Sequence, residues 1–321
     1  MNEPITASEA ASPLGTSDVC AVVISYRPEL NTLKCVLDSM AGQVGRLLIF
    51  DNATPDPTLA TYLKSVESAW IATIRSPVNL GLAAAMNRAA NYAKECGFRY
   101  LLLLDQDSVP EPKMVSTLKT ALLELQRVER VAAVGPQFHD SRSGHVAPFV
   151  RVAFPASHKL YGGPGQRISC DFLISSGTLL PLDVLTEIGG MDESLFIDNV
   201  DLEWCFRALH HGLALYGICD AKMRHSIGDS LRPSIFKRSG IMVHQPLRLY
   251  YIMRNRVQLY RRKETPARWI AQDVPRLVLK FVFTAILLAP RHEYLRCMLL
   301  GLYDGIRGAS GPMRPPSHKA Q

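Results

Sequence analysis

Short, uninterrupted apolar runs that alternate with longer helical segments limit the fold of this chain more than any other feature. The expected strands are Val19–Ser25, Leu47–Phe50, Ile71–Arg75 and Tyr100–Leu104. The expected helices between them are Leu30–Met40, Leu59–Val66 and Leu82–Cys96. Strands that are apolar throughout are typical of a parallel sheet, which helices cover on both faces. The pattern predicts an α/β fold with a Rossmann-like, mostly parallel sheet flanked by helices.

Charge divides the chain into two parts. Residues 1–230 carry 19 Lys and Arg against 25 Asp and Glu, whereas residues 231–321 carry 17 against 4. We expect disordered ends at 1–17 and 311–321, a large domain at 18–240 and a basic, helical C-terminal segment at 241–310. The basic segment favours an anionic partner. Nucleic acid is not expected, because no zinc-finger, RNP or helix-turn-helix signature accompanies the charge.

The C-terminal segment contains an apolar run, residues 277–289, that is too short to span a bilayer. Arg276, Lys280 and Thr284 recur at helical spacing and leave Leu, Val and Phe on the other side. This pattern favours a basic-faced helix lying on an anionic membrane surface. A helix packed on the catalytic core is the alternative. The seven cysteines include no CxxC pair, which indicates a reduced compartment rather than a disulfide scaffold.

Polar and acidic side chains follow the expected strands. In an open α/β sheet the ligand lies beyond the carboxyl ends of the strands, so these residues are expected to meet at one edge. They are Ser25-Tyr26, Asp51-Asn52, Asn79 with Gly81 and Asn87, and Asp105-Gln106-Asp107. The two carboxylates after four leucines need a counter-charge, which a hard divalent cation on substrate phosphates supplies. Asp51 is suited to hydrogen-bond a nucleobase or ribose, and the turn at Asn79 is suited to present backbone N–H groups to phosphate.

A second acidic cluster runs from Phe196 to Arg207. It holds Asp198, Asp201 and Glu203, and Glu203 is spaced i, i+4 from Arg207 for an ion pair. One carboxylate of this cluster with access to a sugar hydroxyl would act as a general base.

In this order, these motifs resemble those of inverting, nucleotide-sugar-dependent glycosyltransferases of family 2, whose fold is called GT-A. The resemblance covers residues 19–260. Within the family, Leu104–Ser108, Ile174–Gly177, Leu195–Trp204 and Arg254-Asn255 resemble bacterial rhamnosyltransferases, in particular those that add the second rhamnose in rhamnolipid synthesis.

The resemblance implies a role for each matching residue. Asp201 is the catalytic base, with Asp198 or Glu203 as a partner or rival, because the usual acidic pair reads Val200-Asp201 here. Asp107 and His225 hold Mg²⁺ or Mn²⁺ on the donor diphosphate. The donor site comprises Ser25, Tyr26, Asp51, Asn79, Asn87, Asp105 and Gln106. The acceptor site comprises Ser176, Gly177, Trp204 and Arg254, although a core position for Trp204 is an equal alternative.

The implied reaction is the inverting transfer of rhamnose from dTDP-L-rhamnose to an amphiphilic glycolipid, converting mono- to di-rhamnolipid. The alternative acceptor is a polyprenyl-linked saccharide of cell-surface polysaccharide synthesis. Nucleotidyl transfer and a non-catalytic nucleotide-sugar-binding protein are the other classes considered. The expected location is peripheral, on the cytoplasmic face of the bacterial inner membrane.

Overall fold

The computed structural model describes residues 15–140, 146–225, 230–232 and 241–313, and the expected disordered ends fall largely outside these ranges. The strands are β1 (Val19–Ser25), β2 (Arg46–Asp51), β3 (Ile71–Arg75), β4 (Tyr100–Asp105), β5 (Val109–Pro110), β6 (Val131–Asp140), β7 (Phe149–Arg151), β8 (His158–Leu160), β9 (Arg167–Cys170), β10 (Leu179–Pro181), β11 (Ala214–His225), β12 (Ser230–Arg232) and β13 (Ile241–Val243). The helices are α1 (Leu30–Met40), α2 (Pro57–Val66), α3 (Leu82–Glu95), α4 (Met114–Leu125), α5 (Leu182–Ile188), the 3-10 turn η1 (Glu193–Leu195), α6 (Val200–His210), α7 (Pro246–Leu259), α8 (Ala267–Leu287) and α9 (Arg291–Arg307).

The main sheet has the order β3-β2-β1-β4-β10-β6-β11-β5, with β9 paired to β11. Strands β3, β2, β1 and β4 are parallel, as are β6 and β11, whereas the short β10 runs antiparallel between β4 and β6. The prediction of a mostly parallel sheet is therefore confirmed. The four predicted strands match β1 to β4 to within one residue at each end.

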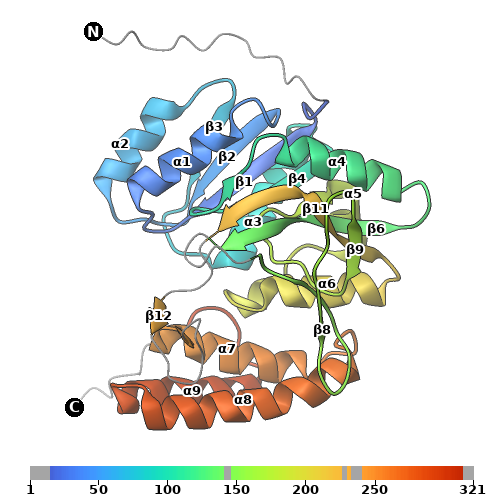
Figure 1. Ribbon diagram of the computed structural model, residues 1–321. Helices are drawn as coiled ribbons and strands as arrows, with labels where there is room; N and C mark the ends of the chain where they lie inside the picture. Colours follow the sequence, from blue (N-terminus) through green and yellow to red (C-terminus); the bar gives the residue numbers. More distant parts are fainter. Residues whose placement is uncertain (1–14, 141–145, 226–229, 233–240, 314–321) are drawn as a thin grey trace.

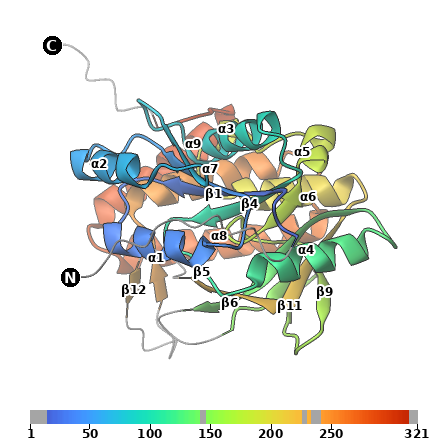
Figure 2. The same cartoon turned by 90° about the horizontal axis from the view of Figure 1, so that it is seen from above.

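Two apolar layers cover the faces of the sheet. Side chains from α1, α2 and α4 fill one face, and side chains from α3, α5 and α6 fill the other. Each buried strand contributes to both layers, because alternate residues of a strand point to opposite faces of the sheet. Figures 1 and 2 show the helices on both sides of the sheet.

Helices α7, α8 and α9 form a separate layer beside α6 (Figure 1). They share a small core of their own that includes Met253, Leu277 and Met298. The layer is joined to α6 by an edge-on contact between Phe206 and Trp269, whose ring centroids lie 5.3 Å apart. Helices α8 and α9 thus cover residues 267–287 and 291–307 of the C-terminal segment. No helix within the described ranges has the length and apolar character needed to cross a membrane.

Candidate active site

The strand-end residues lie at one edge of the sheet, as their positions predict. Ser25 is the register partner of Asp51 on β2, and Ile24 is the partner of Asp105 on β4. Since these three strands are parallel, their carboxyl ends bring Ser25, Asp51 and Asp105 side by side.

Asp51 is fully buried at this edge. Its Oδ1 accepts a hydrogen bond from the backbone N–H of Thr54 at 2.9 Å, and its Oδ2 lies 3.1 Å from Nε of Arg75. Oδ2 is thus ion-paired with Arg75, whereas the buried Oγ of Ser25 has no hydrogen-bond partner among the described residues. Buried polar atoms in proteins are nearly always hydrogen-bonded, so this hydroxyl indicates a place for a polar ligand. A cavity of about 390 Å³, lined by residues 53–55 and 75–77, opens beside it.

Tyr26 and Gln106 are joined by two hydrogen bonds. The Tyr26 backbone N–H donates to Oε1 of Gln106 at 2.8 Å, and Nε2 of Gln106 donates to the Tyr26 carbonyl at 3.3 Å. The Gln106 amide therefore ties the end of β1 to the turn that carries the acid pair. This contact places both residues at the predicted donor edge.

Several N–H groups of the turn after β3 and of the start of α3 are bonded within the protein. The Asn79 side chain accepts from Nδ2 of Asn52 and from the N–H of Gly81. At the start of α3, the N–H groups of Leu82 and Ala83 both point to the carbonyl of Phe196. The first two N–H groups of α3 are thus capped by the protein itself, and the Asn79 side chain holds the turn, so its predicted part in donor binding stays a prediction.

Ser176 and Gly177 lie next to the turn that carries the acid pair and hold it in place. The backbone N–H of Asp105 donates to Oγ of the buried Ser176 at 2.9 Å, and that hydroxyl donates to Ser108 at 2.7 Å. Gly177 has a φ of +79°, and a Cβ there would come within 2.6 Å of Pro136. Both residues, predicted to contact the acceptor, are used to fix the turn at Asp105.

Asp201 lies in the first turn of α6, close enough to Asp105 for their charges to interact. Burial raises the pKa of its carboxyl to about 6, and the negative charges of Asp105 and Asp198 act in the same direction. Hydrogen bonds from the backbone of Leu202 and Ser175 oppose this rise. The two aspartate groups, about a hundred positions apart in sequence, therefore meet in one site. A carboxyl with such a pKa is suited to take a proton near neutral pH.

The other two carboxylates of the cluster are paired with arginines. Glu203 is buried, and it accepts from Arg207 at 2.8 and 3.0 Å and from Arg262 at 2.9 Å. The predicted pair with Arg207 is confirmed. Asp198 lies 3.0 Å from Nε of Arg248. A carboxylate held by two guanidinium groups is a poor base, so Glu203 is removed as a rival of Asp201.

The segment before Asp201, residues 195–199, is strained and held from two sides. Phe196, Asp198 and Asn199 have φ values of +63°, +64° and +60°, which residues other than glycine rarely adopt. On one side, the Phe196 carbonyl accepts from Leu82 at 2.6 Å. On the other side, Nδ2 of Asn255 on α7 donates to the carbonyls of residues 195, 197 and 198 at 2.7–3.0 Å.

Arg254 holds the same segment and is not an acceptor ligand. We call the side chains of Arg254 and Asn255 together the clamp. Arg254 is fully buried, and its NH2 group donates to the Leu195 carbonyl at 2.8 Å while its NH1 group donates to Gly311 at 2.5 Å. The Arg-Asn pair, predicted from resemblance to contact the acceptor, instead positions the segment that leads into Asp201.

Two further predicted ligands have structural contacts. Trp204 is 2% exposed and donates to the carbonyl of Gly189, so its ring belongs to the core and cannot stack on a sugar. Asn87 holds the segment before η1: its Oδ1 accepts from Met191 N–H, and its Nδ2 donates to Met191 and Glu193. Both of its N–H groups are used in this way, so only Oδ1 can accept a further hydrogen bond.

A metal ion would find only part of its ligand set in the described chain. No group of three or more His, Cys, Asp or Glu residues there is arranged to hold one. His225 ends β11, and its side chain lies outside the part of the chain that the structure describes. Asp105 and Asp107 nevertheless supply the hard carboxylate oxygens that Mg²⁺ and Mn²⁺ prefer, and a substrate diphosphate would supply more. The residues present therefore fit a site that is completed by the donor.

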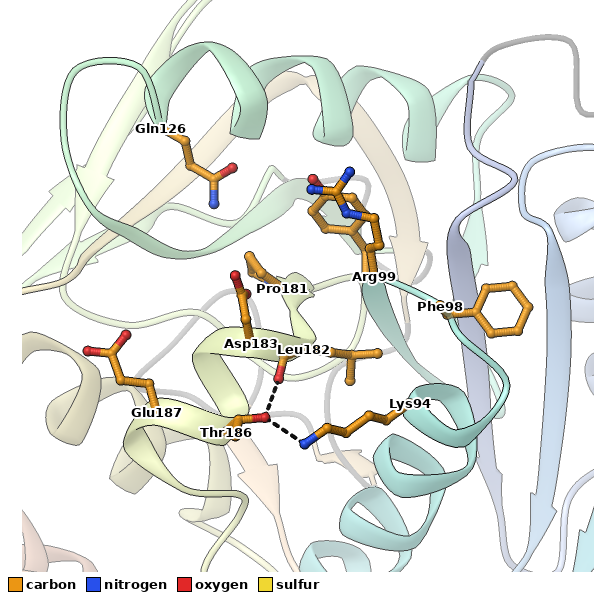
Figure 3. A pocket seen from close by; sticks show the side chains of 10 residues that line it. Lys94, Phe98, Arg99, Gln126, Pro181, Leu182, Asp183, Thr186 and Glu187 are labelled. Atoms are coloured by element: carbon orange, nitrogen blue, oxygen red, sulfur yellow. Dashed lines mark hydrogen bonds between the residues drawn. The ribbon is translucent and has the colours of Figure 1, made fainter.

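A cavity of about 550 Å³ lies away from this edge (Figure 3). It is lined by residues around the start of β4 and by α5, including Lys94, Tyr100 and Thr186. The start of β4 is the opposite end of the strand from Asp105. The cavity therefore does not belong to the site described above.

Comparison with known proteins defines the class. Residues 21–155 match the model of the family described as glycosyl transferase family 2. The chain is 31% identical over 302 residues to the dTDP-rhamnosyl transferase RfbF of Shigella flexneri, a match that covers 92% of this chain and 97% of that protein.

Solved structures share the fold. The S. aureus TarS 1–349 fragment matches with a TM-score of 0.54 at 16% identity, over 91% of this chain and 80% of the other. GalNAc-T7, crystallised with UDP, GalNAc and Mn²⁺, matches with a TM-score of 0.58 at 12% identity, but this chain spans only 56% of its length. At these identities the likeness concerns the fold alone.

The chain belongs to glycosyltransferase family 2. It is a glycosyltransferase with the GT-A type of fold, as its motifs predicted.

Arg75, Arg248, Asn255 and Arg262 are residues of the site and its support that the sequence analysis missed. Arg75 had a usable signal, because it ends β3 in register with Asp51. The other three lie 50 to 60 positions from their partners and are recognisable only in the folded chain.

Proposed function

We propose that this protein transfers L-rhamnose from dTDP-L-rhamnose, with inversion, to a saccharide on a polyprenyl-linked lipid in cell-surface polysaccharide synthesis. The donor is proposed because the relative RfbF is a dTDP-rhamnosyl transferase and aligns along nearly the whole chain. The observation that carries the chemistry is the meeting of Asp201 with Asp105 at the carboxyl edge of the sheet. In this proposal Asp201 is the base, and it acts beside the group that would hold the donor diphosphate.

Each part of the site takes one task in this proposal. The thymidine portion of the donor meets Asp51, Ser25 and the cavity next to Arg75. Asp105 and Asp107 hold a divalent cation, which when bound neutralises charge on the leaving diphosphate. Asp201 accepts the proton from the acceptor hydroxyl as that oxygen attacks the anomeric carbon. A single carboxylate on the acceptor side gives direct displacement and inversion of the anomeric centre.

The rhamnolipid acceptor, which the motifs first suggested, has less support. Two of the residues expected to contact it, Trp204 and Arg254, are buried in structural roles. RfbF is named for rhamnosyl transfer without a rhamnolipid acceptor, which favours the polysaccharide alternative.

The test is an acceptor comparison. The purified chain is incubated with Mg²⁺, dTDP-L-rhamnose and either a short-chain polyprenyl diphosphate saccharide or mono-rhamnolipid, and dTDP release and product mass are measured. We expect rhamnosylation of the polyprenyl-linked saccharide. Transfer to mono-rhamnolipid alone would overturn the acceptor assignment, and release of dTMP-containing products would overturn the reaction class.

Asp51 provides a test of the donor site. Asp51→Asn removes the buried charge beside the nucleoside cavity, so we expect the KM for dTDP-L-rhamnose to rise about tenfold with little change in kcat. Asp56→Asn, at the exposed N-cap of α2 five positions later, is the control and should leave KM unchanged. A kcat effect without a KM effect would place Asp51 outside the donor site.

A further inference from the structure

The outer side of α8 and α9 is apolar. We call this surface the α8–α9 apolar face. It comprises Val274, Val278, Leu279, Val282 and Ile286 of α8 and Leu295, Leu299, Tyr303 and Ile306 of α9, whose exposed fractions run from 37% to 68%. The two helices lie on the side of the molecule away from the sheet, and the first turns of α8 contact the α/β domain through Trp269 and Gln272 (Figure 1). A shallow cavity of about 540 Å³, lined mainly by apolar side chains such as Leu295, Leu299 and Tyr303, lies along α9.

Helix α8 carries apolar side chains on both sides. Its inward side holds the buried Trp269 and Leu277 together with the buried Asp273 and Thr284, and its outward side carries exposed valine, leucine and isoleucine. A surface helix of a soluble protein normally turns its apolar stripe to the core. Apolar patches made of many neighbouring large side chains mark surfaces that meet a partner or a membrane.

Basic residues surround this face. Arg276, Arg291 and Arg296 are exposed, and none of them forms an ion pair within the described chain. Residues 246–313 carry 12 Lys and Arg against 4 Asp and Glu. An apolar face with unpaired arginines around it is complementary to a bilayer surface with anionic headgroups, where aliphatic side chains enter the acyl boundary and arginines meet phosphate.

We propose that the α8–α9 apolar face docks on an anionic lipid bilayer, with α8 and α9 lying in the plane of the membrane surface. The opposite side of α8 faces the catalytic layer, since the charge of Lys280 interacts with Asp198, which in turn acts on Asp201. One layer of helices therefore separates the membrane surface from the base. This placement suits an acceptor whose lipid part remains in the bilayer, but the docking itself does not depend on which sugar is transferred.

Vesicle co-sedimentation of the full chain tests the proposal. We expect binding to phosphatidylcholine–phosphatidylglycerol vesicles and much weaker binding to phosphatidylcholine alone. The double variant Leu279→Glu/Val282→Glu should bind at least about tenfold more weakly, because two charges replace apolar side chains at the boundary. Val128→Glu, which changes a 79% exposed valine after α4, is the matched control and should bind like the wild type.

The arginines give a separate readout. Arg291→Gln and Arg296→Gln should each weaken binding to the anionic vesicles about fivefold, with no effect on phosphatidylcholine vesicles. Circular dichroism and thermal unfolding confirm that each variant is folded. Unchanged vesicle binding by a folded Leu279→Glu/Val282→Glu variant overturns the proposal. So does a wild-type dimer that ignores vesicles and becomes monomeric in that variant, which would assign the face to a second copy of the chain. Neither result bears on the proposed rhamnosyl transfer, because no step of the assay uses the donor.

Discussion

Asp201→Asn should reduce glycosyl transfer by about a thousandfold while leaving donor binding intact. General-base catalysis by a positioned side chain contributes about 10² to 10⁴ to a rate, and Asn cannot accept the proton. The substitution keeps the size of the side chain, and the amide oxygen still accepts from the Leu202 N–H that Asp201 bonds at 2.9 Å. The measurement is steady-state transfer together with calorimetric binding of the nucleotide-sugar.

The chain offers a matched control in Asp183. It lies in the first turn of α5, as Asp201 lies in the first turn of α6, and its Oδ1 accepts from the next backbone N–H at 2.8 Å. Because Asp183 is exposed and away from the cleft, Asp183→Asn should keep the wild-type rate. Transfer by Asp201→Asn within tenfold of this control would remove Asp201 from the role of base.

The raised pKa of Asp201 also predicts how the transfer rate and the folding stability depend on pH, and the two change in opposite directions. A base works in its deprotonated form, so transfer should fall about tenfold per pH unit as the pH drops below about 6. For stability the sign is reversed. The folded pKa of about 6 lies above the unfolded value of 3.8, so the stability that this group contributes is present below pH 3.8 and is lost as pH rises through 6.

Asp201→Asn should therefore unfold at a higher temperature than the wild type at pH 8, by an amount that corresponds to about 1 to 3 kcal/mol. This gain should vanish near pH 4. Thermal unfolding at both pH values measures it, and an equal gain at the two pH values would contradict a burial-raised pKa.

The parts of this fold that the sequence predicts are those set by short-range pattern. Val19–Ser25 and Tyr100–Leu104 are apolar without interruption because helices cover both faces of the sheet, so their strands and the strand-end acids Asp51 and Asp105 are readable from the sequence. Which member of a motif faces the cleft is not readable. Asp201, Glu203 and Trp204 lie within one helical turn but have different surroundings. Asp201 interacts with the charge of Asp105, Glu203 pairs with Arg262 from 59 positions away, and Trp204 lies in the core.

The same limit applies to α8. Spacing identifies Lys280 and Thr284 as one stripe, but only contact with α7 and α9 decides that this stripe faces inward and the valines outward. Periodicity shows that a helix has two faces, and the rest of the fold determines which of them meets solvent.

Asn255→Ala should destabilise the protein and disable the site together. The Asn255 amide donates to the carbonyls of Leu195, Ile197 and Asp198, and its loss removes this partner from all three, of which Leu195 keeps the bond from Arg254. Such a loss costs about 3 kcal/mol, and the positive φ values of the 195–199 segment add strain that only this clamp and Phe196 oppose. Since that segment leads directly into Asp201, a shift of about 1 Å should lower kcat about a hundredfold.

Gln258→Ala is the control for Asn255→Ala. It lies one turn later on α7 and removes a single hydrogen bond, to the carbonyl of Ala309, which does not involve the 195–199 segment. We expect it to cost about 1 kcal/mol and to leave kcat unchanged. Urea unfolding and transfer rates measured on the three variants then separate the two roles. Asp201→Asn should lose activity and gain stability at pH 8, whereas Asn255→Ala should lose both. The difference arises because burial of the base lowers the stability of the fold, so the base must be held in place by residues whose own contacts stabilise the fold. An Asn255→Ala variant with wild-type stability and rate would show that the 195–199 segment keeps its strained conformation without α7.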